Sequence, residues 1–155
     1  MIQTERLTIR IAADEEMQAL IAAQTDEDMR QAYTEMWELC RENPAERAWY
    51  AVWVTELRST GERIGDLCFK GLSPEGETEI GYGFLPEFWG KGYATEAVTA
   101  LTQWAAKQPG VRRIEAETDP ENAASRRVLE KAGYLPTGTV GEEGPRFVWS
   151  GSMEK

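Results

Sequence analysis

The segment between residues 79 and 97 passes from a strand pattern, through a turn with two glycines, directly into a helix pattern; it reads EIGYGFLPEFWGKGYATEA. Gly90 and Gly92 allow the backbone to adopt positive φ and to approach a ligand closely. The first N–H groups of the following helix lack partners within the helix, and with the helix dipole they suit a phosphate. This junction therefore predicts an anion site at residues 89–95.

Two common phosphate-binding motifs are absent from the sequence. It contains no GxxxxGK[ST], and no GxGxxG follows its first predicted strand, so neither a P-loop nor a dinucleotide-binding fold is indicated. The chain also has no histidine, and Cys40 and Cys68 form no CxxC pair and lie among apolar residues. We therefore expect no metal site and two core cysteines, and any general base is a carboxylate or water.

Apolar periodicity places this turn within a mixed α/β chain. Two helices are expected in the first third, one capped by Asp14 and one that ends at Asn43-Pro44. Turn signals at residues 59–62 and 73–76 predict a meander of three antiparallel strands. The predicted strands are residues 6–11, 49–57, 63–70, 78–85, 113–118, 135–140 and 146–149, and the later helices are residues 93–108 and 121–132.

The last predicted helix has the clearest boundary signals. Asp119 can cap it, Pro120 suits the first helical position, and Gly133 stands where a helix stop is expected. No repeat, low-complexity tract or linker interrupts the chain, and its 155 residues suit one compact core. We therefore predict a single domain over residues 1–155.

The excess of acidic over basic side chains indicates which kinds of ligand the protein attracts or repels. With 27 acidic and 17 basic side chains the net charge is −10, a field that repels nucleic-acid phosphates and attracts cations. The acidity serves either solubility or the steering of a cationic ligand, and the sequence leaves both open. No stretch approaches the ~20 apolar residues of a membrane helix. The start, MIQTERLTIR, lacks the apolar core of a signal peptide, so we expect a cytoplasmic protein without membrane contact.

Residues 89–94, WGKGYA, resemble the pyrophosphate loop of the GNAT superfamily, which reads [RQ]xxGx[GA]. They match it at Gly92 and Ala94, whereas Trp89 replaces the usual Arg or Gln. The longer run WGKGYATEA resembles the RimJ/RimL-like branch of that superfamily, in which an aromatic residue or Arg before GKG is common.

A second match follows at residues 119–134, which resemble the NxxSxxxLEKxGF stretch of the same branch through Asn122 and Ser125. The two motifs occur in the order found in the family, each at a predicted strand-to-helix junction. Together they span most of residues 78–134. The first 70 residues resemble the family only in the order of their elements.

The resemblance implies the GNAT α/β fold, a mostly antiparallel twisted sheet split by acetyl-coenzyme A and flanked by helices on both faces. It implies direct transfer of an acetyl group to a primary amine, without a metal or an acyl-enzyme. The strand that carries Gly83 would splay so that its backbone pairs with the pantetheine arm, and Asn122, unless it is only a helix cap, would bind that arm. The implied cofactor-binding residues are Gly83, Phe84, Leu85, Trp89, Gly90, Lys91, Gly92, Tyr93, Ala94, Thr95, Asn122 and Ser125.

The catalytic residues are less strongly marked. Many members of the family use a tyrosine seven residues after the Asn as a general acid, but Leu129 stands there in this chain. Resemblance to the branch therefore assigns assistance of the departing thiolate to Ser125. Glu79 is the candidate base, acting through water, with an ion-paired surface glutamate as an equal alternative. Glu142 and Glu143 are a second pair that can receive a cationic acceptor.

No motif identifies the acceptor. A cationic small-molecule amine or a protein N-terminus is the expected partner, and the chain is expected to be a monomer or a homodimer. Arg126, Arg127 and Lys131 are candidates for the 3′-phosphate of coenzyme A, or simply solvated side chains. Two hypotheses from other classes remain open: a coenzyme A sensor without turnover, and a scaffold that binds a partner but no cofactor.

Overall fold

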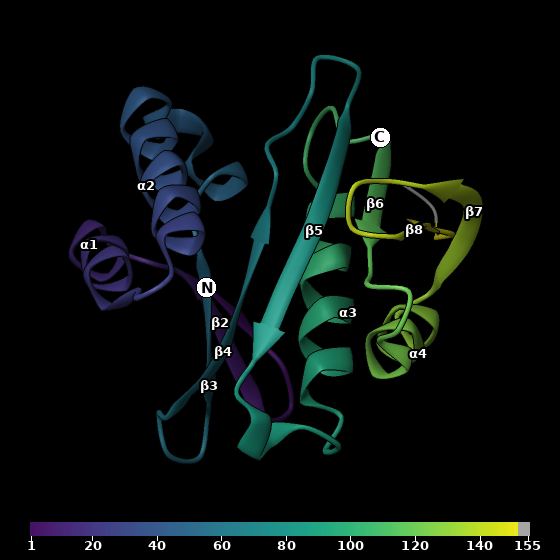
Figure 1. Cartoon of the computed structure of the whole chain (residues 1–155), viewed down its shortest axis with the longest axis horizontal. Helices are drawn as coiled ribbons and strands as arrows, with labels where there is room; N and C mark the ends of the chain where they lie inside the picture. Colours follow the sequence, from purple (N-terminus) through teal and green to yellow (C-terminus); the bar gives the residue numbers. More distant parts are fainter. Residues whose placement is uncertain (152–155) are drawn as a thin grey trace.

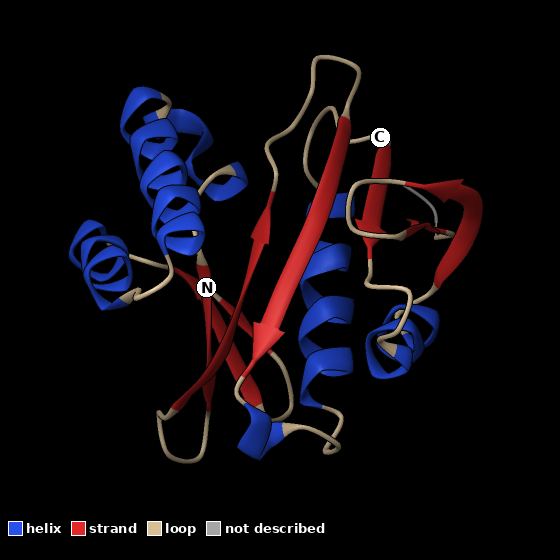
Figure 2. Cartoon of the chain, viewed as in Figure 1, coloured by secondary structure: helices blue, strands red, loops and turns tan. Residues whose placement is uncertain are grey.

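The computed structural model describes residues 1–151. The chain contains both helices and strands, which Figure 2 colours blue and red. The strands are β1 (Ile2–Gln3), β2 (Leu7–Ile11), β3 (Trp53–Leu57), β4 (Arg63–Phe69), β5 (Glu77–Phe84), β6 (Arg113–Glu117), β7 (Tyr134–Val140) and β8 (Pro145–Trp149). The helices are α1 (Asp14–Ala23), α2 (Glu27–Glu42), α3 (Tyr93–Ala106) and α4 (Ala123–Lys131), with two short 3-10 helices, η1 (Pro44–Trp49) and η2 (Pro86–Phe88).

The strands form one sheet in the order β1-β2-β3-β4-β5-β6-β8-β7. Strands β3, β4 and β5 are antiparallel neighbours, which confirms the predicted meander. Strands β5 and β6 instead run parallel, and their pairing stops at Glu79 of β5. Figure 1 shows β6 beside the upper part of β5 and separated from its lower part, with α3 visible between the lower part of β5 and α4. Within residues 1–151, this divergence leaves one edge of residues 80–84 without a strand partner.

Helices cover both faces of the sheet. Adjacent residues of β3 point to opposite faces, and Trp53 belongs to the larger apolar core while Val54 belongs to a second cluster. The larger core includes Leu101 of α3, and the second cluster includes Met17 of α1 and Cys40 of α2. The predicted mixed α/β architecture is confirmed. None of the helices between residues 1 and 151 is long and apolar enough to cross a membrane.

Aromatic side chains fill the centre of the larger core. The ring centroids of Trp49 and Phe69 lie 4.9 Å apart, and those of Trp53 and Trp104 are separated by the same distance of 4.9 Å in an edge-to-face arrangement. Such pairs add to the stabilisation from burial. Trp49, Trp53 and Trp104 therefore serve packing of the core.

Three predicted boundaries are wrong, each for a local reason. The strand predicted at residues 49–57 begins only at Trp53, because residue 49 ends η1; Pro44 fixes a helical φ at the start of η1 and good helix formers follow it. Helix α1 is capped at Ala13, so Asp14 lies in its first turn. The N-cap of α4 is Asn122 rather than Asp119.

Candidate active site

The turn before α3 ends in a helix start without a side-chain cap. Gly90 has a φ of 77° and Gly92 a φ of 82°, the left-handed conformation that only glycine adopts readily. Gly92 is the N-cap residue, and no side chain of the described residues accepts a hydrogen bond from the first N–H groups of α3. These donors are therefore available to an anion, as the sequence predicts.

Arg6 links this turn to the N-terminal part of the chain through a hydrogen bond and an ion pair. Its Nη1 donates to the carbonyl oxygen of Lys91 at 2.9 Å, and its Nε pairs with the carboxylate of Glu96 at 2.7 Å. The guanidinium also lies 4.3 Å from the centroid of the Tyr93 ring. Glu96 is an acidic residue in the first turn of α3, and Arg6 offsets the negative charge that would otherwise repel an anion there.

A cavity of about 430 Å³ lies between this turn, the free edge of β5 and the start of α4. A volume of this order suits a small-molecule site. Leu85 and Lys91 do not line it. The predicted cofactor-binding residues that do line it are Gly83, Phe84, Trp89, Gly90, Gly92, Tyr93, Ala94, Thr95, Asn122 and Ser125.

Only some of the basic residues of α4 line this cavity. Arg127 and Lys131 line the cavity, whereas Nη2 of Arg126 donates to the carbonyl oxygen of Pro120 at 3.0 Å. The structure therefore brings two of the three candidate phosphate ligands to the cavity.

The free edge of β5 presents backbone groups of alternate residues. The N–H of Lys70 donates to the carbonyl of Glu79, and the N–H of Leu85 donates to Ile64, each at 2.9 Å. Backbone groups alternate between the two sides of an antiparallel strand. The backbone N–H and C=O groups of residues 80, 82 and 84 therefore face the split between β5 and β6. The N–H of Leu85 is already bonded to Ile64. The carbonyl of Phe84 accepts the indole N–H of Trp89 at 2.8 Å.

The start of α4 places a pair of hydroxyl groups at the edge of this cavity. The side chain of Asn122 accepts a hydrogen bond from the N–H of Ser125 at 2.9 Å, so it caps the helix. The hydroxyl of Ser125 lies 2.7 Å from that of Tyr82 on β5. Leu129, at the position where tyrosine is usual, is fully buried in the core. The tyrosine hydroxyl that lies next to Ser125 therefore comes from β5 rather than from α4.

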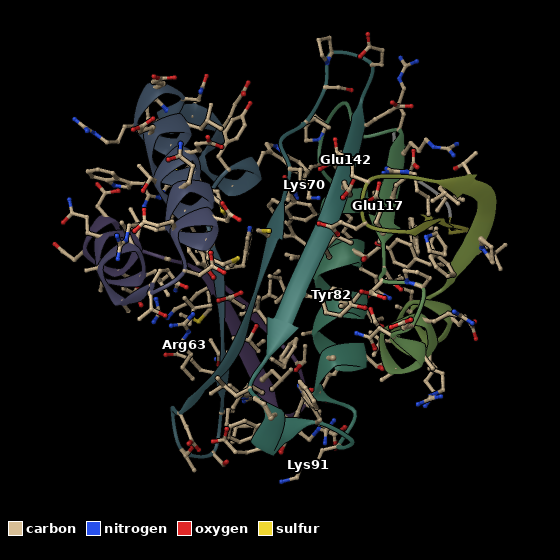
Figure 3. All side chains as sticks on the ribbon, viewed as in Figure 1. Arg63, Lys70, Tyr82, Lys91, Glu117 and Glu142 are labelled. Carbon is tan, nitrogen blue, oxygen red and sulfur yellow. The ribbon has the colours of Figure 1, made fainter. Side chains whose placement is uncertain are left out.

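Tyr82 was missed in the sequence because strand alternation puts it on the core-facing side with Ile80 and Phe84. Its hydroxyl also donates to the carbonyl oxygen of Ser125 at 3.2 Å. Figure 3 shows Tyr82 on the side of β5 that faces α4. Burial raises the pKa of Tyr82, although its bond to Ser125 opposes that effect. Tyr82 is therefore a protonated donor near neutral pH.

A second cavity, of about 690 Å³, lies on the other side of β5. Helix α2 forms one wall, and parts of β4, β5 and β6 form the rest. Tyr82, Gly83 and Ser125 line this cavity as well as the first one. The two cavities therefore meet at the hydroxyl pair.

Acidic side chains dominate the charged lining of the second cavity. Its ionisable acids are Glu35, Asp66, Glu79, Glu117 and Glu143, against Lys70 as the one lysine or arginine in the lining. This imbalance gives the cavity a negative potential that favours a cation. Glu143 lines the cavity, whereas Glu142 does not.

Glu79 belongs to an ion-pair network at one end of this cavity. Its Oε2 lies 2.7 Å from Nζ of Lys70, and its Oε1 lies 3.1 Å from Nη1 of Arg146. Arg146 also pairs with Glu115 at 3.0 Å and with Glu117. In Figure 3, Lys70 and Glu117 approach β5 from either side, far from Lys91 at the turn. The ion-paired role, one of the two alternatives for Glu79, is the one its contacts support.

Cys68 is part of the wall of the second cavity rather than of the core. Burial raises the pKa of its thiol to about 11. The thiol therefore stays protonated near neutral pH and is a poor nucleophile. Cys40 is buried, as predicted. No group of metal-ligating side chains occurs among residues 1–151.

Comparison with known proteins gives matches over most of the chain. The family profile described as acetyltransferase (GNAT) domain matches residues 3–135. The uncharacterized N-acetyltransferase YoaA of Bacillus subtilis (strain 168) is 28% identical over 151 residues, which cover 90% of this chain and 85% of YoaA.

Solved structures show the same architecture. An acetyltransferase of the GNAT family from Bacillus anthracis has a TM-score of 0.67 and 26% sequence identity, covering 95% of each chain. RimL, a ribosomal L7/L12 alpha-N-protein acetyltransferase solved in complex with coenzyme A, has a TM-score of 0.71 and 17% identity, covering 94% of this chain and 93% of RimL. At that identity the likeness to RimL concerns the fold.

Proposed function

Because this chain belongs to the acetyltransferase (GNAT) domain family, we propose that it transfers an acetyl group from acetyl-coenzyme A to a cationic primary amine, as a single domain over residues 1–155. The predicted GNAT fold is confirmed, and the chain is an acetyltransferase of a family that uses acetyl-coenzyme A. The proposal concerns how this chain holds the donor and which acceptor it takes. The observation that carries it is the meeting of two cavities at Tyr82 and Ser125.

The first cavity fits the donor in three respects. The uncapped start of α3 offers N–H groups to a pyrophosphate, and the backbone of Tyr82 and Phe84 faces the split, where it can pair with amides as an added strand would. Arg127 and Lys131 supply positive charge on its far wall. Acetyl-coenzyme A supplies the acetyl group as a thioester, whose carbon–sulfur bond is replaced by a carbon–nitrogen bond to the acceptor.

The hydroxyl pair is placed to assist the leaving thiolate. The Tyr82 hydroxyl can donate to Oγ of Ser125, and the single proton of the Ser125 hydroxyl is then free for donation to a ligand atom. A donor aimed at the sulfur is worth most when negative charge develops there. The acceptor enters as an ammonium ion, loses one proton to water, and attacks as a free amine. The second proton that the attacking nitrogen releases as the amide forms would go to the departing thiolate.

The second cavity supports a cationic acceptor. Its acidic lining attracts an amine in the protonated form that prevails at neutral pH. RimL, whose name states that it acetylates a protein alpha-amino group, shares the fold. We also propose membership of the RimJ/RimL-like branch, supported by the WGKGYATEA run and by Ser125 at the junction of the cavities.

The test is a transfer assay with radiolabelled acetyl-coenzyme A and a panel of amines, preceded by calorimetric titration of coenzyme A. We expect coenzyme A binding and acetylation of at least one cationic amine. A sensor would bind coenzyme A and acetylate none of the panel. A scaffold would show no affinity for coenzyme A. Either result contradicts the proposal.

A further inference from the structure

One face of α2 forms an apolar wall of the second cavity. Met29, Ala32, Met36 and Leu39 recur at helical spacing and all line it. Met29 is 45% exposed and Leu39 is 38% exposed, so part of this wall faces the open cavity rather than the core. A small ion with its hydration shell would leave this surface in contact with water.

One of the carboxylates that line this cavity lies beside a residue that the two cavities share. Asp66 on β4 is the cross-strand partner of Gly83 on β5, and Gly83 lines both cavities. An added Cβ at Gly83 would meet no atom within 4 Å, so the space above this pair is open. Side chains of directly paired residues lie on the same face of a sheet. The Asp66 side chain therefore lies on the same face of the sheet as the open space at Gly83, a residue that lines both cavities.

Within the described residues, one of the two carboxylate oxygens of Asp66 has a hydrogen-bond partner. Nη2 of Arg63 lies 2.7 Å from Oδ2, and the Asp66 side chain is 24% exposed. Burial raises the pKa of Asp66, and the ion pair with Arg63 only partly offsets this effect. A second cation that hydrogen-bonds Oδ1 would complete the solvation of this carboxylate.

Tyr33 of α2 is a further polar group of this end of the cavity. It lines the same cavity, and burial, followed by the nearby Asp66 carboxylate, raises its pKa to about 12. Its phenol is thus neutral and can accept a hydrogen bond from an ammonium group. Asp66, Tyr33 and the apolar wall together match an amine that has a charged end and an apolar end.

Building on the proposed function, we propose that the acceptor is a primary amine attached to an apolar body, with Asp66 holding its ammonium group beside Gly83 while α2 covers the apolar body. A polyamine would satisfy Asp66 but would leave the α2 wall unused. A cavity of about 690 Å³ has room for an aromatic or branched aliphatic group. Asp66 then sets specificity by orienting the amine, separately from the hydroxyl pair.

Binding of 2-phenylethylamine to the coenzyme A complex, followed by calorimetry, tests the proposal. We expect Asp66→Asn to weaken binding by about tenfold to a hundredfold, because a hydrogen bond to a charged group is lost. Arg63→Gln is the matched control, since it breaks the same ion pair but keeps the carboxylate. We expect it to leave amine affinity unchanged or to increase it. Circular dichroism and coenzyme A affinity establish that each variant is folded.

A second comparison tests the apolar body. The wild-type protein should bind 2-phenylethylamine at least about tenfold more tightly than 1,4-diaminobutane, because only the former buries a ring against α2. Equal affinity, or preference for the diamine, overturns the apolar part. An equal loss in Asp66→Asn and Arg63→Gln overturns the role of Asp66, as does no loss in either. If the wild-type protein does not bind coenzyme A, the proposed function is contradicted instead.

Discussion

At the residue scale, the chain lacks the tyrosine that the family commonly provides from α4, and a different tyrosine reaches the same neighbourhood. Leu129 occupies the usual position and is fully buried, so it takes no part in the chemistry. The Tyr82 hydroxyl lies 2.7 Å from that of Ser125. Both residues line both cavities. The Tyr82 hydroxyl also contacts the carbonyl oxygen of Ser125, so we propose that Ser125 is the member of the pair that contacts the leaving sulfur.

Replacing Ser125 with alanine should lower kcat by about tenfold to a hundredfold and change KM little, because the lost hydrogen bond is strongest in the transition state. Tyr82→Phe should lower kcat less, since it acts by orienting the serine hydroxyl. The two losses should not add, because the hydroxyls form one unit. Steady-state kinetics of both variants and the double variant measure this. An unchanged kcat in Ser125→Ala would assign the serine to structure alone.

At the scale of elements, the turn between β5 and α3 depends on backbone conformation and on a contact with the distant N-terminal strand region. Gly92 has a φ of 82°, and an added Cβ would lie 3.3 Å from Nη2 of Arg6. A side chain there would both strain the backbone and press on the guanidinium that holds Lys91 and Glu96. Gly92 therefore belongs to the anion site and also lies against the Arg6 side chain that supports the turn.

We expect Gly92→Val to weaken coenzyme A binding by at least about tenfold, because the turn shifts away from its phosphate-binding conformation. Gly138→Val is the control, since Gly138 also has positive φ, has open space around it and lies on β7 away from both cavities. Its strain should reduce stability without reducing affinity. Calorimetric titration and thermal denaturation separate the two effects. Equal affinity losses would mean that strain alone is responsible.

A second set of contacts joins elements at the other side of the sheet. Arg10 of β2 pairs with Glu16 of α1 at 2.6 Å and with Glu56 of β3 at 3.1 Å. The hydrogen bond from Arg10 is the largest cause of the lowered pKa of Glu16, which falls from 4.5 to about 2. A lowered carboxylate pKa stabilises the folded protein above pH 4.5. That contribution is lost as the pH falls toward 2.

Glu16→Gln should therefore lower the free energy of unfolding by about 1 kcal/mol at pH 7, a value reduced for partial exposure, since the Glu16 side chain is 37% exposed. The difference from wild type should shrink as the pH falls from 4.5 to 2. Urea denaturation at several pH values measures it. Glu15→Gln, at an exposed neighbour, is the control and should show a smaller effect. A difference that stays constant with pH would refute the ion-pair account.

At the scale of the whole molecule, the sequence predicts what depends on local pattern and misses what depends on distant contacts. Periodicity and turn residues were enough for the meander and for α3, because these are local properties. The contact between Arg6 and Glu96 joins residues 90 positions apart. The roles of Tyr82 and Asp66 likewise depend on the register between strands and on where β5 and β6 diverge. Neither is encoded in a short motif.

We expect the net charge of −10 to act on a cationic acceptor through the field at the second cavity, to which Glu79 contributes despite its pairs with Lys70 and Arg146. We expect Glu79→Gln to raise KM for a cationic amine several-fold at low ionic strength, with less effect on kcat. Added salt should reduce the difference, because the long-range attraction of a cation to the cavity is screened beyond about 10 Å at 0.1 M.

Kinetics at 0.02 and 0.5 M salt test this prediction, with the exposed Glu62→Gln in the β3–β4 turn as a control of equal charge change. Glu62 lies outside both cavities, so its variant should follow the wild type closely. A loss of kcat in Glu79→Gln that persists at high salt and alters the pH profile would instead assign Glu79 to proton transfer. Identical kinetics in both variants at every salt concentration would leave solubility as the reason for the acidity.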